Sequence, residues 1–135
     1  MVTADEQDPT GRSLEQVENH DWGDPPPDAT RLIAAVHRLR RKPIKHLTTA
    51  DLRTLIAQRV GLTALVPRVL PHLEHDPYVE ADHYPGDLLA AVLRIPATHW
   101  KAHPRQRFRV EQITAAIDEP DDQLKADIAA FHTGQ

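Results

Sequence analysis

The chain has 135 residues with 16 basic and 20 acidic side chains, a net charge of −4, and no cysteine. This length predicts one domain with a sizeable core, and the absence of cysteine excludes disulfides and thiolate metal sites. The polar N-terminus and the short apolar runs predict neither a signal peptide nor a membrane-spanning helix, so we expect a cytoplasmic protein.

The charges alternate in sign along the chain, which a net charge of −4 conceals. The blocks contain eight acids and one base in 1–30, eight bases and one acid in 31–60, five acids and one base in 61–93, five bases and no acid in 94–109, and six acids and one base in 110–135. Blocks of opposite sign can pair within a folded domain, or one block can remain exposed as a docking surface.

The N-terminal region begins with a polar segment, 1–12, which we expect to be a disordered tail. The predicted domain comprises 13–135. Ser13 and Gln16 have the spacing of a capping box, which predicts a short helix over 14–19.

A proline-rich segment, DWGDPPPD, follows and predicts a stiff, extended connector with Trp22 as its anchor on the core. Asp28 or Thr30 caps the next predicted helix, 29–41, which ends before Pro43 because a residue preceding proline is pushed out of the α region. Its apolar residues recur on one face: Leu32, Ile33, Val36 and Leu39.

Two amphipathic helices joined at Gly61 come next. Thr48 or Thr49 caps the first, and Gly61 is the expected glycine just past its C-terminus (C′). The second covers 62–73 and contains two prolines, with a kink expected at Pro71. The apolar positions of the pair are Leu52, Leu55, Ile56, Val60, Leu62, Leu65, Val66, Val69, Leu70 and Leu73.

The C-terminal half begins with a predicted loop, 76–86, followed directly by a short helix. Further helices are predicted from Pro96, over 105–117, and from Pro120 as first helical residue (N1). Their apolar positions are Leu88, Leu89, Val92, Leu93, Trp100, Phe108, Ile113, Ile117, Leu124, Ile128 and Phe131. Because strand-like alternation is almost missing, we expect an all-α, single compact domain of about seven or eight short helices.

Histidine pairs are the first candidates for chemistry. His99 and His103 are four residues apart and His72 and His75 three apart, spacings that aim two imidazoles at one point. Trp100 stands where the glutamate of an H-E-x-x-H site would be, and no spacing supplies a third ligand. We therefore expect partly exposed histidines, with no metal, no cofactor and no catalytic residue; a metal-dependent hydrolase is the less favoured alternative.

A basic segment, 38–59, is the second candidate, because its side chains could contact phosphate. The helices around Gly61 have a spacing similar to helix-turn-helix, but the second begins with apolar residues where a DNA-reading helix needs polar ones. A helical nucleic-acid-binding regulator therefore stays open as the alternative function. The other interpretation is that these bases pair with the acidic blocks.

An acidic stretch with two tyrosines is the third candidate. Tyrosine supplies rigid contact area and carboxylates steer a basic partner, so the stretch is typical of a protein-docking surface. The alternative is that some of these carboxylates only cap helices, Asp87 in particular. The predicted partner-binding residues are Glu74, Asp76, Tyr78, Glu80, Asp82, Tyr84 and Asp87.

From Leu14 to Trp100 the chain resembles the contact-dependent growth inhibition immunity proteins of bacteria. The matching pieces are LEQVE, DWGDPPPDAT, HRLRRKPIKHLTTADLRTLIAQ, GLTALVP, and the stretch from DPYVEADHYPGDLLAAVL to HW. The resemblance covers about two-thirds of the chain, and its pieces are specific in combination.

The resemblance implies a cytoplasmic, non-enzymatic antitoxin that binds the C-terminal toxin domain of an effector delivered by a sibling cell. Many such toxins are nucleases, which are basic where they hold nucleic acid, so an acidic inhibitor face is the physical complement. We expect a monomer with the cognate toxin domain as its partner, and no membrane or nucleic acid.

Overall fold

The computed structural model describes residues 11–134, and its regular secondary structure is entirely helical. Eight α-helices occur in this part of the chain, with a short 3₁₀ turn, η2 (Ile44–His46), between the second and third. They are α2 (Leu14–Glu18), α3 (Arg31–Arg40), α4 (Thr49–Ala57), α5 (Leu62–His75), α6 (Asp87–Leu93), α7 (Ala97–Ala102), α8 (Pro104–Ala115) and α9 (Asp122–His132). The predicted all-α class is confirmed. Residues 1–10 of the predicted disordered tail lie outside the described part.

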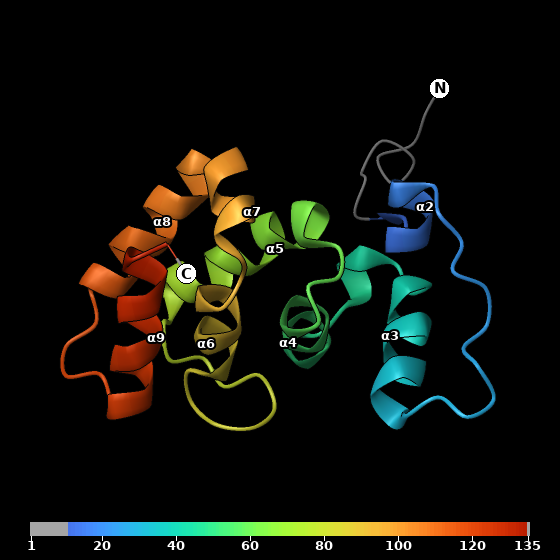
Figure 1. Cartoon of the computed structure of the whole chain (residues 1–135), viewed down its shortest axis with the longest axis horizontal. Coiled ribbons are helices and arrows are strands. Elements are labelled where there is room, and N and C mark those ends of the chain that lie inside the picture. Colours follow the sequence, from blue (N-terminus) through green and yellow to red (C-terminus); the bar gives the residue numbers. More distant parts are fainter. Residues whose placement is uncertain (1–10, 135) are drawn as a thin grey trace.

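The helices do not form a regular bundle; each packs on its neighbours from one end of the molecule to the other (Figure 1). Helix α4 packs on α3, α5 and α6, while α5 also packs on α8, and α6 on α9. In Figure 1, α2 and α3 therefore form one end of the molecule, α7, α8 and α9 the other, and α4, α5 and α6 its middle.

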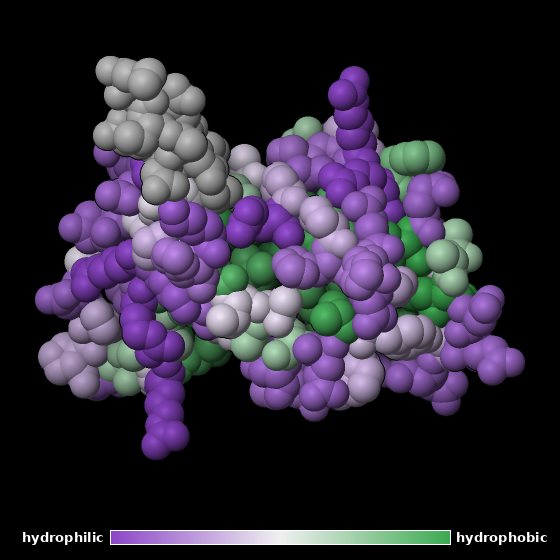
Figure 2. Space-filling model, turned by 180° about the vertical axis from the view of Figure 1, so that it is seen from behind, coloured by the Kyte–Doolittle hydropathy of each residue, from purple (hydrophilic) through white to green (hydrophobic). Residues whose placement is uncertain are grey.

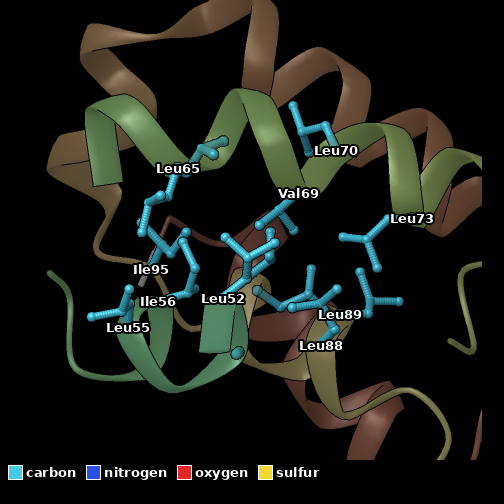
Figure 3. Close-up of a cluster of buried hydrophobic side chains, with 14 of the residues drawn as sticks. Leu52, Leu55, Ile56, Leu65, Val69, Leu70, Leu73, Leu88, Leu89 and Ile95 are labelled. Atoms are coloured by element: carbon cyan, nitrogen blue, oxygen red, sulfur yellow. The ribbon is translucent and has the colours of Figure 1, made fainter. Parts of the chain in front are cut away.

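The core lies where α4, α5 and α6 meet (Figure 3). All seven residues of α6 are buried, so this short helix is the centre around which the others pack. At the α7–α9 end, the rings of Trp100 and Phe131 meet edge to face, 5.7 Å apart. The side chains labelled in Figure 3 are Leu52, Leu55, Ile56, Leu65, Val69, Leu70, Leu73, Leu88, Leu89 and Ile95.

The predicted caps set the helix N-termini. The capping box of Ser13 and Gln16 is present, with the Ser13 N–H donating to the Gln16 side chain at 2.9 Å. Thr30 accepts the backbone N–H of Ile33 and starts α3. Thr48 forms a second capping box, with Asp51 three residues later. Each cap satisfies backbone donors that the first helical turn leaves unpaired.

The end of α4 differs from the prediction. The C′ residue is Arg59, not Gly61, because a Schellman motif closes the helix two residues earlier. The N–H of Arg59 donates to the carbonyl of Ile56 at 2.9 Å, and that of Val60 to the carbonyl of Leu55 at 2.9 Å. Arg59 consequently has a φ of 60°, a left-handed conformation in which glycine is the usual residue.

Gly61 is instead the N-cap of α5, with a φ of 69°. A Cβ atom at this position would lie 2.6 Å from Cδ1 of Leu14, whose side chain is fully buried. Glycine is therefore required here twice, for its backbone and for the close approach of α2. Pro120 is also displaced from its predicted place: Asp121 is the N-cap of α9, so the proline precedes the helix.

Several apolar positions do not face the core as predicted. Phe108 is 58% exposed, and Val110 occupies the buried face of α8 instead. On α3, Leu32 and Ile33 are 44% and 46% exposed, while Val36 and Leu39 are buried. Helix α3 lies at one end of the molecule, and within residues 11–134 part of its apolar face stays uncovered. Val60, Ile117 and Ile128 are only partly buried but pack against the core.

Trp22, the predicted anchor of the connector, is 42% exposed and does not enter the apolar core. Its ring instead lies over the guanidinium of Arg40, with Cζ 4.2 Å from the ring centroid. Arg40 is 1% exposed and donates to the Glu18 carboxylate and to the His20 carbonyl. The connector is therefore attached through a buried arginine.

Candidate partner-binding site

The segment 76–86 forms a closed loop with its own hydrogen bonds. The N–H of Gly86 donates to the carbonyl of Tyr78 at 3.0 Å, and Glu80 bridges to Pro85 in antiparallel fashion. At the start of the loop, Asp76 accepts the N–H of Tyr78 at 3.0 Å, an Asx turn. The loop thus presents its side chains from a defined backbone.

Asp87 holds this loop from the first turn of α6. Its carboxylate accepts three backbone N–H bonds, from Ala81 at 2.7 Å, Asp82 at 3.0 Å and His83 at 2.8 Å. Burial of the carboxyl group opposes its ionisation, but these bonds outweigh that effect and lower the pKa of Asp87 to about 2. Since Asp87 is 1% exposed, its role is to position the loop.

The two tyrosines of the loop are exposed, Tyr78 by 37% and Tyr84 by 44%. They line a small hollow of about 30 Å³ together with Asp121 and Asp127 of the α9 region. Sequence reasoning missed these two aspartates as neighbours of the loop. The acidic block at 110–135 indicated an acidic segment, but only the packing of α9 on α6 places it here.

Three of the predicted carboxylates differ in their ion pairs. Glu74 makes a bidentate pair with Arg109, whose Nε lies 2.9 Å from Oε2; hydrogen bonding to this guanidinium lowers the pKa of Glu74. Asp82 lies 3.5 Å from Nε of Arg53. Glu80 is exposed, and its side chain has no ion pair within residues 11–134.

We define the acidic loop face as the exposed part of the predicted set: Asp76, Tyr78, Glu80, Asp82 and Tyr84. Glu74 is exposed at its border, already paired with a base, and Asp87 supports the face from beneath. Seen from behind, the molecule has hydrophobic residues along its middle between hydrophilic rims (Figure 2).

Part of the basic segment 38–59 is paired with acids of the same chain. Of its first bases, Arg40 pairs with Glu18, Arg41 with Asp24, and Lys42 with Asp51. The start of α5, which would have to read bases in a helix-turn-helix, instead turns buried leucine and valine side chains into the core. Both observations disfavour a nucleic-acid interface in this part of the chain.

His99 of α7 and His103, between α7 and α8, do not aim at a common point. The rings of His99 and His103 stack 4.2 Å apart, with Nε2 of His99 donating to Gln106 and Nδ1 of His103 donating to the His99 carbonyl. Within residues 11–134, no three histidine or carboxylate side chains are grouped so that they could hold a metal ion. Nor does any helix of this part combine the length and the apolar character that crossing a membrane requires.

Comparison with known families decides the relationship. A family model of CDI immunity proteins, where CDI is contact-dependent growth inhibition, matches residues 16–110. The chain belongs to the CDI immunity proteins. The match includes the whole of the acidic loop face and excludes α9. A search of curated proteins found no match.

Proposed function

We propose that this CDI immunity protein acts in the cytoplasm by binding the toxin domain of one cognate effector, a nuclease, and blocking it in a tight one-to-one complex. The acidic loop face is the proposed contact surface, with Glu74 at its border and Asp87 as its internal support. The proposal assigns the protein no catalytic step, cofactor or metal.

Family membership carries this proposal, since a CDI immunity protein implies a toxin as partner. The loop supports it in two further ways. Its backbone is held by the carboxylate of Asp87 and by the Gly86–Tyr78 hydrogen bond, so little order has to be acquired on binding. Its tyrosines are exposed beside carboxylates, the combination that supplies contact area and a polar rim.

The carboxylates of the acidic loop face favour a basic partner. Glu80 is unpaired within the described residues and Asp76 is exposed, while Asp121 at the α9 N-terminus adds a further carboxylate beside the tyrosines. A nuclease is basic where it holds nucleic acid, and opposite potentials accelerate diffusional encounter in a salt-dependent way. The alternative, a nucleic-acid-binding regulator that uses 38–59, has less support because the bases Arg40, Arg41 and Lys42 are paired.

The test is a charge reversal at Glu80, whose side chain has no ion-pair partner within residues 11–134 to disturb. We expect Glu80→Lys to slow association with the toxin domain about tenfold at low ionic strength and to reduce its salt dependence. Stopped-flow association at several salt concentrations measures both. Asp28→Lys is the matched control, because Asp28 is exposed in the segment before α3, and α3 lies at one end of the molecule, away from α6. Equal association rates in the two variants would contradict the proposed contact face.

A further inference from the structure

A second hollow beside the loop is lined by arginines together with Asp87. It has a volume of about 180 Å³ and lies between the C-terminus of α4 and α6. Three arginines from separate segments line it: Arg53, Arg59 and Arg94. Tyr84 of the acidic loop face forms part of its wall, so the two features share one surface.

The three guanidiniums are compensated to different degrees. Arg94 is fully engaged, since it makes two hydrogen bonds to Asp127, at 3.2 and 3.1 Å. Arg53 is loosely compensated, because its buried Nε lies 3.5 Å from Asp82 and has no hydrogen-bond partner in the described part of the chain. A buried donor without a partner is costly, and a ligand that accepts from it recovers that energy.

Arg59 is uncompensated by any residue that the structure describes. Its exposed side chain makes no hydrogen bond or ion pair with any residue in 11–134. It also has the C′ position of α4, with φ at 60°, where glycine or asparagine would relieve the backbone. A residue held in a sparsely populated backbone region is a reason to look for a functional use of its side chain.

We propose that Arg59, with Arg53 and Tyr84, forms a receptor for one carboxylate group, supplied by an aspartate or glutamate side chain of the toxin. The inference rests on the proposed function for the identity of the partner. A guanidinium fork matches the two oxygens of a carboxylate. A second negative charge would face Asp82 and Asp87, which lie 3.5 and 3.6 Å from Arg53, so the site favours a monoanion over a phosphate dianion.

This receptor contributes to the selection of the partner. A toxin surface that complements the acidic loop face must be mostly basic, yet must place one carboxylate at the arginine hollow. A uniformly basic surface would leave Arg59 facing like charge, which is costly in an interface. The arginine hollow thus restricts binding to a particular pattern of charges rather than to basic proteins in general.

The first test needs only the free protein. Sodium acetate is titrated while the arginine Nε–H resonances are followed by NMR, with sodium chloride keeping ionic strength constant. We expect a saturable shift at Arg59 and Arg53 with a dissociation constant on the order of millimolar. Inorganic phosphate at the same ionic strength should bind more weakly. No saturable shift with acetate, or tighter binding of phosphate, would overturn the carboxylate assignment.

Two variants distinguish the effect of the Arg59 side chain on binding from an effect on folding. Arg59→Asn keeps a residue that tolerates the left-handed conformation, so we expect it to fold and to abolish acetate binding. Arg38→Asn is the matched control, an exposed arginine on α3, and should bind acetate like the unaltered protein. Acetate binding that survives Arg59→Asn contradicts the proposal.

The last test measures the kinetics of the complex with the toxin domain. With the toxin domain, Arg59→Asn should raise the dissociation rate about tenfold and leave the association rate nearly unchanged, unlike Glu80→Lys. An unchanged dissociation rate in a toxin complex that still forms overturns the receptor and leaves the proposed function standing. Failure of the unaltered protein to bind its toxin removes the proposed function, while the acetate titration still decides the hollow.

Discussion

At the scale of single residues, Asp87 shows how one side chain can organise a loop. It is the first residue of α6, yet its three hydrogen bonds run backward to the loop, to the N–H groups of Ala81, Asp82 and His83. A carboxylate is suited to this task because it only accepts, and two oxygens can serve three donors. The alternative prediction that Asp87 caps a helix is therefore wrong, because Gly86 is the N-cap of α6 and the Asp87 carboxylate bonds to the loop.

The substitution Asp87→Asn should destabilise the protein by roughly 1–3 kcal/mol, the cost of leaving buried polar groups unsatisfied. The amide –NH₂ would face a backbone N–H that now donates to the carboxylate. Chemical denaturation at neutral pH measures the change. Asp76→Asn is the comparison, because Asp76 is exposed and accepts one N–H in an Asx turn that asparagine also forms. Equal loss in both variants would contradict the special role of Asp87.

At the scale of elements, the junction between α4 and α5 determines how α2 is attached. The left-handed Arg59 and Gly61 redirect the chain within three residues. Leu14 of α2 packs directly on the space that a side chain at Gly61 would need. The sequence identified the helices on both sides and the turn between them. It predicted Gly61 as the C′ residue of α4 because glycine is the usual residue there. In the structure Arg59 takes that position, and Gly61 is needed where Leu14 packs.

Gly61→Ala should destabilise the protein by about 2 kcal/mol or more, since it combines left-handed strain with overpacking against Leu14. Gly23→Ala is a matched control: its φ is 73°, but no atom of residues 11–134 lies within 4 Å of the added Cβ. Thermal or urea unfolding should place Gly61→Ala clearly below Gly23→Ala. Similar losses would show that only the backbone matters and that the contact with Leu14 is tolerated.

At the scale of the whole molecule, the alternating charge blocks pair with their neighbours in order. Glu18 of the first block pairs with Arg40 of the second, and Asp82 of the third with Arg53 of the second. Two further pairs join neighbouring blocks in the same way: Glu74 with Arg109, and Asp127 with Arg94. Each exposed pair contributes little to stability on its own.

Acid should destabilise the protein through carboxyl groups with lowered pKa values. A group whose pKa is lower in the folded state stabilises above its unfolded pKa, and this contribution is lost as pH falls through the folded pKa. For Asp87 the window extends from 3.8 down to about 2, worth about 2 kcal/mol. Asp51 and Glu74 shift in the same direction.

Urea unfolding at several pH values tests this. The free energy of unfolding should fall steeply between pH 4 and pH 2, and Asp87→Asn should show a shallower fall over the same range. An identical pH profile in this variant would mean that the pKa of Asp87 is not lowered in the folded state.

The sequence by itself determined the helical class, most helix starts and the position of the loop, because caps and periodicity act between residues three or four apart. The long-range outcomes needed tertiary structure. Phe108 and Leu32 satisfy a helical pattern yet are exposed, since which face is covered depends on distant neighbours. The conversion of Asp87 into an internal support depends on how the loop folds back over α6. The arginine hollow likewise exists only because α4 and α6 pack together, which brings Arg53, Arg59 and Arg94 beside Tyr84.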